Sequence, residues 1–130
     1  MRLLLPLTLV LLLAGLPARA DDEYDACLGD ADASMQDMGA CGTEWIDRED
    51  ARLNEMWQAL LAELPEDSEE LLRDEQRAWL AYRDATCLFY LDPVEYGQVG
   101  QYLSYPSSRA FVIAQRNDAL NEILVSVAPQ

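Results

Sequence analysis

The sequence has 130 residues, in which 24 carboxylates outnumber nine arginines and both lysine and histidine are absent. The N-terminus is typical of a secretory signal peptide cleaved after Ala20, because an apolar run separates Met1-Arg2 from Ala18-Arg19-Ala20. Cleavage leaves one domain, residues 21–130, with a net charge of −17. That charge excludes nucleic acid as a partner, and the apolar run is too short to insert across a membrane, so we expect a periplasmic or secreted protein.

The predicted elements begin with an acidic stretch, residues 21–25, that we expect to be a frayed terminus. Ser34 is suited to cap a short helix, which Gly39 and Gly42 would end or kink. Apolar residues then recur at helical spacing over about residues 44–64 and over about 68–90. A proline-containing turn separates these two long helices.

The last part of the chain is predicted to be a long loop and one more helix. The loop, residues 91–106, contains two glycines and three tyrosines, and loops of this length are often functional. Ser107 or Ser108 then caps a helix that runs nearly to Pro129. No segment shows the alternation of a strand. The sequence therefore predicts an all-α fold: a compact antiparallel bundle of three main helices plus a short N-terminal helix.

Two motifs in the long helices resemble a known family. Cys41, the stretch Asp50-Ala51-Arg52-Leu53-Asn54 and the run QRAWLAYRDATC at residues 76–87 are similar to the LprI-type lysozyme-inhibitor family, also called DUF1311. The similarity covers about residues 27–120. It implies an exported helical domain and, for some members, inhibition of lysozyme. The family commonly has one more cysteine, where this chain has Ser108 or a neighbouring residue.

The motif residues are expected to face one another across the pair of long helices. A helical hairpin centred near residues 66–67 places residues opposite each other as follows: Asp50 with Arg83, Asn54 with Trp79, and Trp57 with Gln76. We interpret Asp50, Asn54, Gln76, Trp79 and Arg83 as a polar seam that fixes the register of the two helices, with an ion pair between Asp50 and Arg83. The alternative is an open site formed by Asp50, Arg83 and Asp84.

The predicted loop is the candidate contact surface for a partner. Its Tyr96, Tyr102 and Tyr105 lie among Gly, Gln and Ser, a composition found in protein-binding surfaces, although a buried lid over the bundle is the alternative. Residues 21–95 carry the whole net charge of −17, whereas residues 96–130 are neutral. We therefore expect an acidic scaffold that attracts a basic protein, and the family resemblance suggests a lysozyme. A non-inhibitory envelope module or an immunity protein is the alternative.

Catalysis is the least favoured function. The chain lacks histidine, a glycine-rich phosphate loop and a G-x-S-x-G nucleophile motif, so we predict no enzyme and no cofactor. Asp30-Ala31-Asp32 opens like a calcium loop, but the glycine and glutamate that such a loop requires are missing, so no metal site is predicted.

Three cysteines leave one without an intramolecular partner in an exported chain. Because the resemblance implies a cysteine near Ser108 that this chain lacks, we expect a Cys27–Cys41 disulfide and an unpaired Cys87. Pairing of Cys87 with Cys27 or Cys41 is the alternative. An unpaired Cys87 is expected to be a buried thiol of a monomer or, otherwise, the link in a covalent dimer.

Overall fold

The computed structural model describes residues 21–31 and 34–128, and the predicted signal peptide lies outside these residues. The longer helices are α1 (Asp22–Asp30), α2 (Met35–Glu63), α3 (Glu66–Thr86) and α5 (Tyr105–Val127). Three short helical segments join α3 to α5: the 3-10 turn η1 (Leu88–Leu91), α4 (Gly97–Val99) and the π-helical turn η2 (Gly100–Ser104). No strand occurs in the described ranges, so the predicted all-α class is confirmed.

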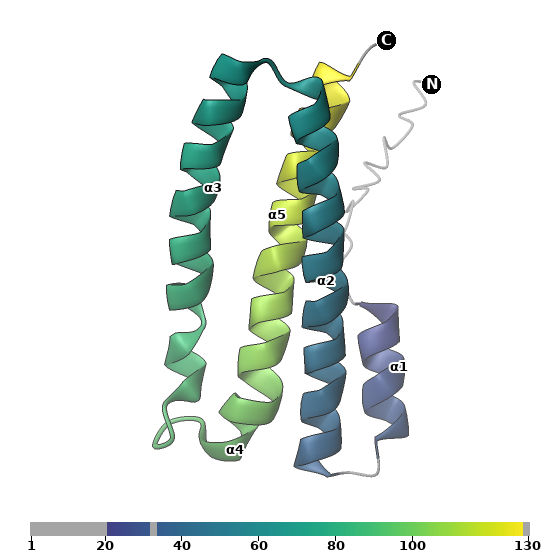
Figure 1. The fold of residues 1–130 in the computed structure, drawn as a ribbon. Coiled ribbons are helices and arrows are strands. Elements are labelled where there is room, and N and C mark those ends of the chain that lie inside the picture. The colour runs from purple at the N-terminus through teal and green to yellow at the C-terminus, as the bar shows by residue number, and fades with distance from the viewer. Residues whose placement is uncertain (1–20, 32–33, 129–130) are drawn as a thin grey trace, which may run out of the picture.

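The helices alternate in direction along the chain. α2 and α5 therefore run parallel to each other and pack side by side, while α3 runs antiparallel to both (Figure 1). The short helix α1 folds back against the N-terminal half of α2. The main buried interface of the molecule is thus between α2 and α5, which are not consecutive in the chain.

The core lies between these two parallel helices. Leu53 and Leu60 of α2 pack with Ile113 and Leu120 of α5 and are almost completely buried. The helix α3 contributes only one buried side chain, Leu72, to this cluster. Burial of aliphatic side chains is the main favourable term in folding, so α3 is held less firmly than α2 and α5.

The helix α2 continues through the two glycines that were expected to break or kink it. A Cβ atom at Gly42 would lie 2.6 Å from Cβ of Pro106, and one at Gly39 would lie 2.7 Å from Cδ1 of Tyr102. The glycines therefore allow η2 and the start of α5 to approach the backbone of α2 closely. Ser34 caps this long helix, since its hydroxyl accepts a hydrogen bond from the Asp37 N–H at 3.2 Å.

The acidic stretch expected to fray forms the beginning of α1. Asp21 is the N-cap, and its carboxylate accepts a hydrogen bond from the Tyr24 N–H at 2.7 Å. Three further carboxylates in the first turn interact favourably with the helix dipole. The short N-terminal helix of the prediction is therefore Asp22–Asp30 and does not begin at Ser34.

The predicted loop, residues 91–106, is largely helical. After η1 the chain turns, and from Gly97, which has a positive φ of 53°, it runs through α4 and η2 into α5 without interruption. Pro106 lies in the first turn of α5, directly after the π-helical turn η2. The loop prediction was wrong because glycine and proline were interpreted as breakers.

Candidate functional site

The residues of the two family motifs line one groove between α2 and α3, which we call the motif groove. Its volume is about 400 Å³, and its walls are Asp50, Leu53, Asn54 and Trp57 from α2 and Gln76, Leu80 and Arg83 from α3. The spacing of these residues places each set on one face of its helix. The motifs are therefore brought together in space, as the helical hairpin predicts.

The direct ion pair predicted between Asp50 and Arg83 is absent from the described part of the chain. Arg83 instead donates to the carboxylate of its neighbour Asp84 at 2.8 Å, and Arg109 of α5 donates to the same carboxylate at 3.1 Å. These two arginines hold the pKa of Asp84 below its usual range. Asp50 and Arg83 remain on opposite walls of an open groove.

Two other members of the predicted seam, Trp79 and Gln76, contact α5. Trp79 packs against the core, and the Arg83 guanidinium lies 5.6 Å from the centroid of its ring. Gln76 accepts a hydrogen bond from Nε of Arg116 at 2.9 Å. Asn54 is exposed and lines the motif groove, and among the described residues it makes no hydrogen bond to Trp79.

The buried polar contacts between helices come from two residues of α5 that the sequence analysis did not single out. Arg116 is 8% exposed and, besides Gln76, binds Glu75 at 2.6 Å. Asn117 is fully buried and donates to the backbone oxygen of Glu49 at 3.0 Å and to its carboxylate at 2.8 Å. Their signal in the sequence is a pair of polar residues inside the apolar stripe of the last helix. Such paired polar groups fix the register of α5 on its neighbours.

The three candidate contact tyrosines are half-buried and do not form one surface. Tyr96 belongs to an aromatic cluster, with ring centroids 5.2 Å from Phe89 and 5.3 Å from Tyr90. Tyr102 and Tyr105 lie together in a shallow groove beside α2.

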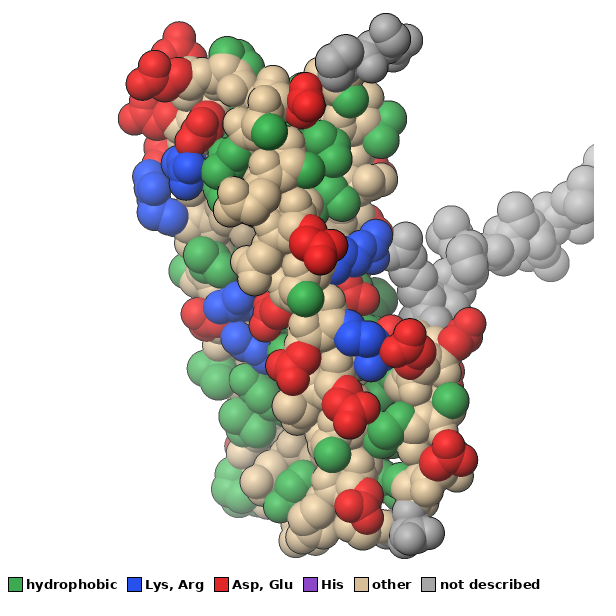
Figure 2. Space-filling view, turned by 45° about the vertical axis from the view of Figure 1, so that its right-hand side comes forward, with side chains coloured by type: hydrophobic (Ala, Val, Ile, Leu, Met, Phe, Trp, Pro, Cys, Tyr) green, Lys and Arg blue, Asp and Glu red, His purple; other side chains and the backbone are tan. Residues whose placement is uncertain are grey.

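Several exposed apolar side chains lie at the end of the molecule that contains η1 and α4. Val94 is 87% exposed and Phe89 is 63% exposed. We call this set the apolar end; it consists of Leu88, Phe89, Leu91, Val94 and Val99. Figure 2 shows green side chains gathered at the lower left, with carboxylates concentrated at the upper left. The aromatic content of this region is visible in the sequence, whereas the exposure of its aliphatic residues and of Phe89 follows only from the fold.

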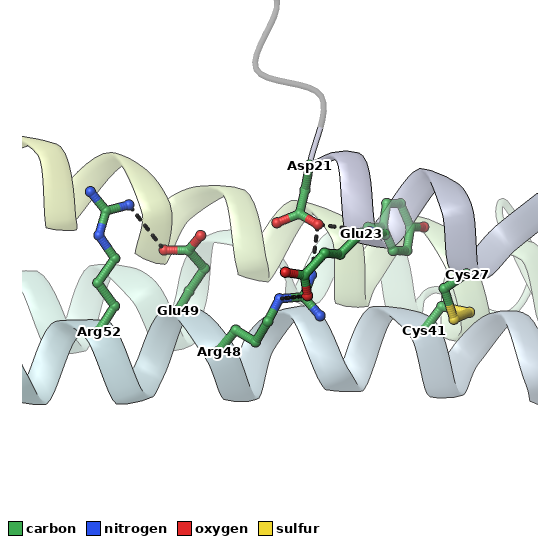
Figure 3. Close-up of polar contacts among 8 residues, drawn as sticks. Asp21, Glu23, Cys27, Cys41, Arg48, Glu49 and Arg52 are labelled. Carbon is green, nitrogen blue, oxygen red and sulfur yellow. Dashed lines mark hydrogen bonds and ion pairs between the residues drawn. A yellow bond between two sulfur atoms is a disulfide. The ribbon is translucent and has the colours of Figure 1, made fainter.

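The disulfide Cys27–Cys41, with its Cα atoms 5.7 Å apart, joins α1 to α2. Toward the start of α1, Arg48 of α2 forms ion pairs with Asp21 at 2.6 Å and with Glu23 at 3.1 Å (Figure 3). The short helix is therefore fixed to α2 by a covalent bond and by two ion pairs at a separate point.

Between these two attachments, the Tyr24 ring of α1 packs on Trp45 of α2. The ring centroids are 4.9 Å apart and the planes are inclined by 31°. Burial raises the pKa of the Tyr24 hydroxyl above its usual value. Because α1 is fixed to α2, it holds the Trp45 indole in place.

Cys87 is unpaired and only 2% exposed. Burial raises the pKa of its thiol, so the thiol is protonated and unreactive near neutral pH. The thiol is not accessible for a covalent link to a second chain without local opening of the structure. Ser108 lines the same groove as Cys87.

Among residues 21–31 and 34–128, no group of three or more cysteine or carboxylate side chains is arranged to hold a metal ion. No helix in those ranges is both long enough and apolar enough to cross a membrane.

A protein-family model described as lysozyme inhibitor LprI matches residues 27–120. No curated protein matches the chain, and no solved structure matches it.

Proposed function

The chain belongs to the LprI lysozyme-inhibitor family, and from this membership we propose that it is an exported acidic protein that binds and blocks a cationic lysozyme or a related cell-wall hydrolase. The observation that carries the proposal is the separation of charge and apolar surface. The carboxylates are concentrated in residues 21–95, and the apolar end lies where these carboxylates become sparse.

The acidic helices supply long-range attraction for a basic enzyme. A net charge of −17 on one domain raises the rate of encounter with a cationic partner at low ionic strength. Exposed charges are screened over about 8–10 Å at ordinary ionic strength, so this contribution falls as salt is added.

The apolar end supplies the contact surface in this proposal. Residues 88–105 contain only two carboxylates, Asp92 and Glu95. Electrostatic repulsion is therefore small when this end approaches the cleft of an enzyme that holds two catalytic carboxylates. Phe89 is the exposed aromatic anchor, and Tyr96 supports it from the side. In this arrangement Tyr96, Tyr102 and Tyr105 contribute through their exposed edges and through the shape of the surface.

Lysis of bacterial cell walls by a basic lysozyme tests the proposal. We expect Phe89→Ala to weaken inhibition by about 30-fold, as removal of a central aromatic contact does in other interfaces. Leu71→Ala is the matched control, because Leu71 is also a highly exposed apolar residue but lies on α3 away from the apolar end. The association rate measured by surface plasmon resonance should fall as salt rises.

A protein that inhibits no lysozyme at micromolar concentration contradicts the proposal and favours an envelope interaction module or an immunity protein. Equal loss of inhibition in the Phe89 and Leu71 variants removes the apolar end from the contact. An association rate that is independent of salt removes electrostatic attraction from the mechanism.

A further inference from the structure

The motif groove between α2 and α3 contains a carboxylate that has no partner within the described part of the chain. Asp50 lines this groove, is half-buried, and makes no hydrogen bond or ion pair with another described residue. Every other half-buried carboxylate in residues 21–31 and 34–128 has a partner: Asp21, Glu49, Glu69 and Asp118. A carboxylate that loses part of its hydration without gaining a partner is unfavourable, so Asp50 requires an explanation.

The arginine on the opposite wall of the groove does not serve Asp50. Nε and Nη2 of Arg83 both donate to the Asp84 carboxylate, at 2.9 and 2.8 Å. The other arginines that the structure describes are also paired with carboxylates: Arg48, Arg52, Arg73, Arg77, Arg109 and Arg116. Lysine and histidine are absent from the sequence. The described part of the chain therefore supplies no cation for Asp50.

The rest of the motif groove suits a cationic side chain that has an apolar stem. Leu53 and Leu80 line the walls beside Asp50 and can cover such a stem. Asn54 follows Asp50 by four residues, so both lie on one face of α2 with Cβ atoms about 5–6 Å apart. Its amide oxygen is a second acceptor. A planar guanidinium, with five donors, can pair with the carboxylate and also donate to this oxygen, whereas an ammonium group is a compact point charge.

We propose that the motif groove receives an arginine side chain from the surface of the basic partner, with the guanidinium paired to Asp50. This inference rests on the proposed function, because the partner is the same cationic hydrolase, and it adds a second point of contact to the apolar end. Asp50 and Arg83 lie at the end of the groove nearer η1, and Arg83 precedes Leu88 by about 8 Å of helix. A standard interface covers about 800 Å² on each partner, which is wide enough for both contacts.

Calorimetric titration with a basic lysozyme at about 0.15 M salt tests the inference, with wild type, Asp50→Asn and Glu55→Gln. Glu55 is the matched control: it is an exposed carboxylate of α2 without a partner among the described residues, and it lies about 140° around the helix from Asp50. Both variants lose one negative charge, so long-range attraction changes equally. We expect Asp50→Asn to weaken binding about tenfold, as loss of a hydrogen bond to a charged group does. Glu55→Gln should weaken it less than about twofold, because exposed charges are screened.

Chemical modification of the lysozyme identifies the group that binds Asp50. Cyclohexanedione modifies arginine side chains and leaves lysine intact. The modified lysozyme should bind wild type and Asp50→Asn with the same affinity, because the ratio of the two affinities measures the coupling between Asp50 and the guanidinium. Urea unfolding without lysozyme provides a separate readout. Asp50→Asn should have the wild-type midpoint, since Asp50 has no partner among the described residues.

Equal weakening by Asp50→Asn and Glu55→Gln overturns the inference and leaves the proposed function intact. An effect of Asp50→Asn that persists with arginine-modified lysozyme overturns it as well, because the group on Asp50 is then not a guanidinium. A lower urea midpoint for Asp50→Asn assigns Asp50 to the stability of the fold and has the same consequence. A wild-type protein that binds no lysozyme contradicts the proposed function itself, and this inference with it.

Discussion

Replacing Gly42 by alanine measures how closely α5 approaches α2. A Cβ atom at this position would lie 2.6 Å from Cβ and 2.9 Å from Cγ of Pro106, whereas ordinary contact lies at 3.4–4 Å. The proline ring is bonded to its own backbone and does not rotate away, so α5 has to shift by about 1 Å. Overpacking of this kind costs about 1–3 kcal/mol.

Helix propensity acts in the opposite direction and sets the net effect. Alanine is more favourable than glycine inside a helix by about 1 kcal/mol. We therefore expect Gly42→Ala to lower the free energy of unfolding by up to about 2 kcal/mol. For a domain of this size each kcal/mol lowers the midpoint of thermal unfolding by about 4–8 °C.

Gly29→Ala in α1 is the matched control, because a Cβ atom there meets no atom within 4 Å. The same substitution should then raise the free energy of unfolding by about 0.5–1 kcal/mol. Urea and thermal unfolding followed by circular dichroism give both values. If Gly42→Ala stabilises the protein as Gly29→Ala does, α5 does not pack on α2 at this distance, and the explanation of the two α2 glycines is wrong.

Three further predictions concern a disulfide, an ionisable group and a buried amide. Ser108→Cys should form a disulfide with Cys87, because both residues line the same groove. In the chain-entropy model this bond raises the free energy of unfolding by about 3 kcal/mol. Non-reducing peptide mapping checks the bond, and urea unfolding checks the stability. The pKa of Asp84 is lowered in the folded protein, so ionised Asp84 stabilises the fold. This stabilisation is fully present at pH values above the usual aspartate pKa near 3.8, and it is lost as the pH falls through the lowered pKa. A nuclear magnetic resonance titration should show this low midpoint, and Arg109→Gln should raise it. Asn117→Ala removes the amide that donates to the partly buried carboxylate and to the backbone oxygen of Glu49 in α2, and it should cost about 1–3 kcal/mol in urea unfolding. Wild-type stability would show that this contact does not hold the helices together.

The helices themselves could be predicted from the spacing of their apolar residues, but their neighbours could not. The hairpin assumption places α3 on α2, because consecutive helices usually pack together. Instead α5 covers the apolar face of α2, through residues such as Ile113 and Leu120. The motif residues consequently share a groove but do not pair across it.

Local signals were also ambiguous where tertiary contacts decide. In isolation Gly39 and Gly42 weaken a helix, and only the presence of Tyr102 and Pro106 against them explains why the helix continues. The helical run before α5 was missed for a similar reason: its glycines and proline resemble those of a loop until their packing is known. The Cys27–Cys41 disulfide could be predicted, because the family resemblance implies a partner cysteine for Cys87 that this chain lacks.

The weak attachment of α3 has a consequence for local unfolding. Of its 21 residues only Leu72 is buried, whereas α2 and α5 are joined by the main core and α1 is joined to α2 by a disulfide. Cooperative units with few buried apolar contacts open at a lower free energy than the whole protein. Native-state hydrogen exchange should therefore distinguish two groups of backbone amides. The amides of α3 should exchange through separate, low-energy opening, while those at the centres of α2 and α5 exchange only through global unfolding.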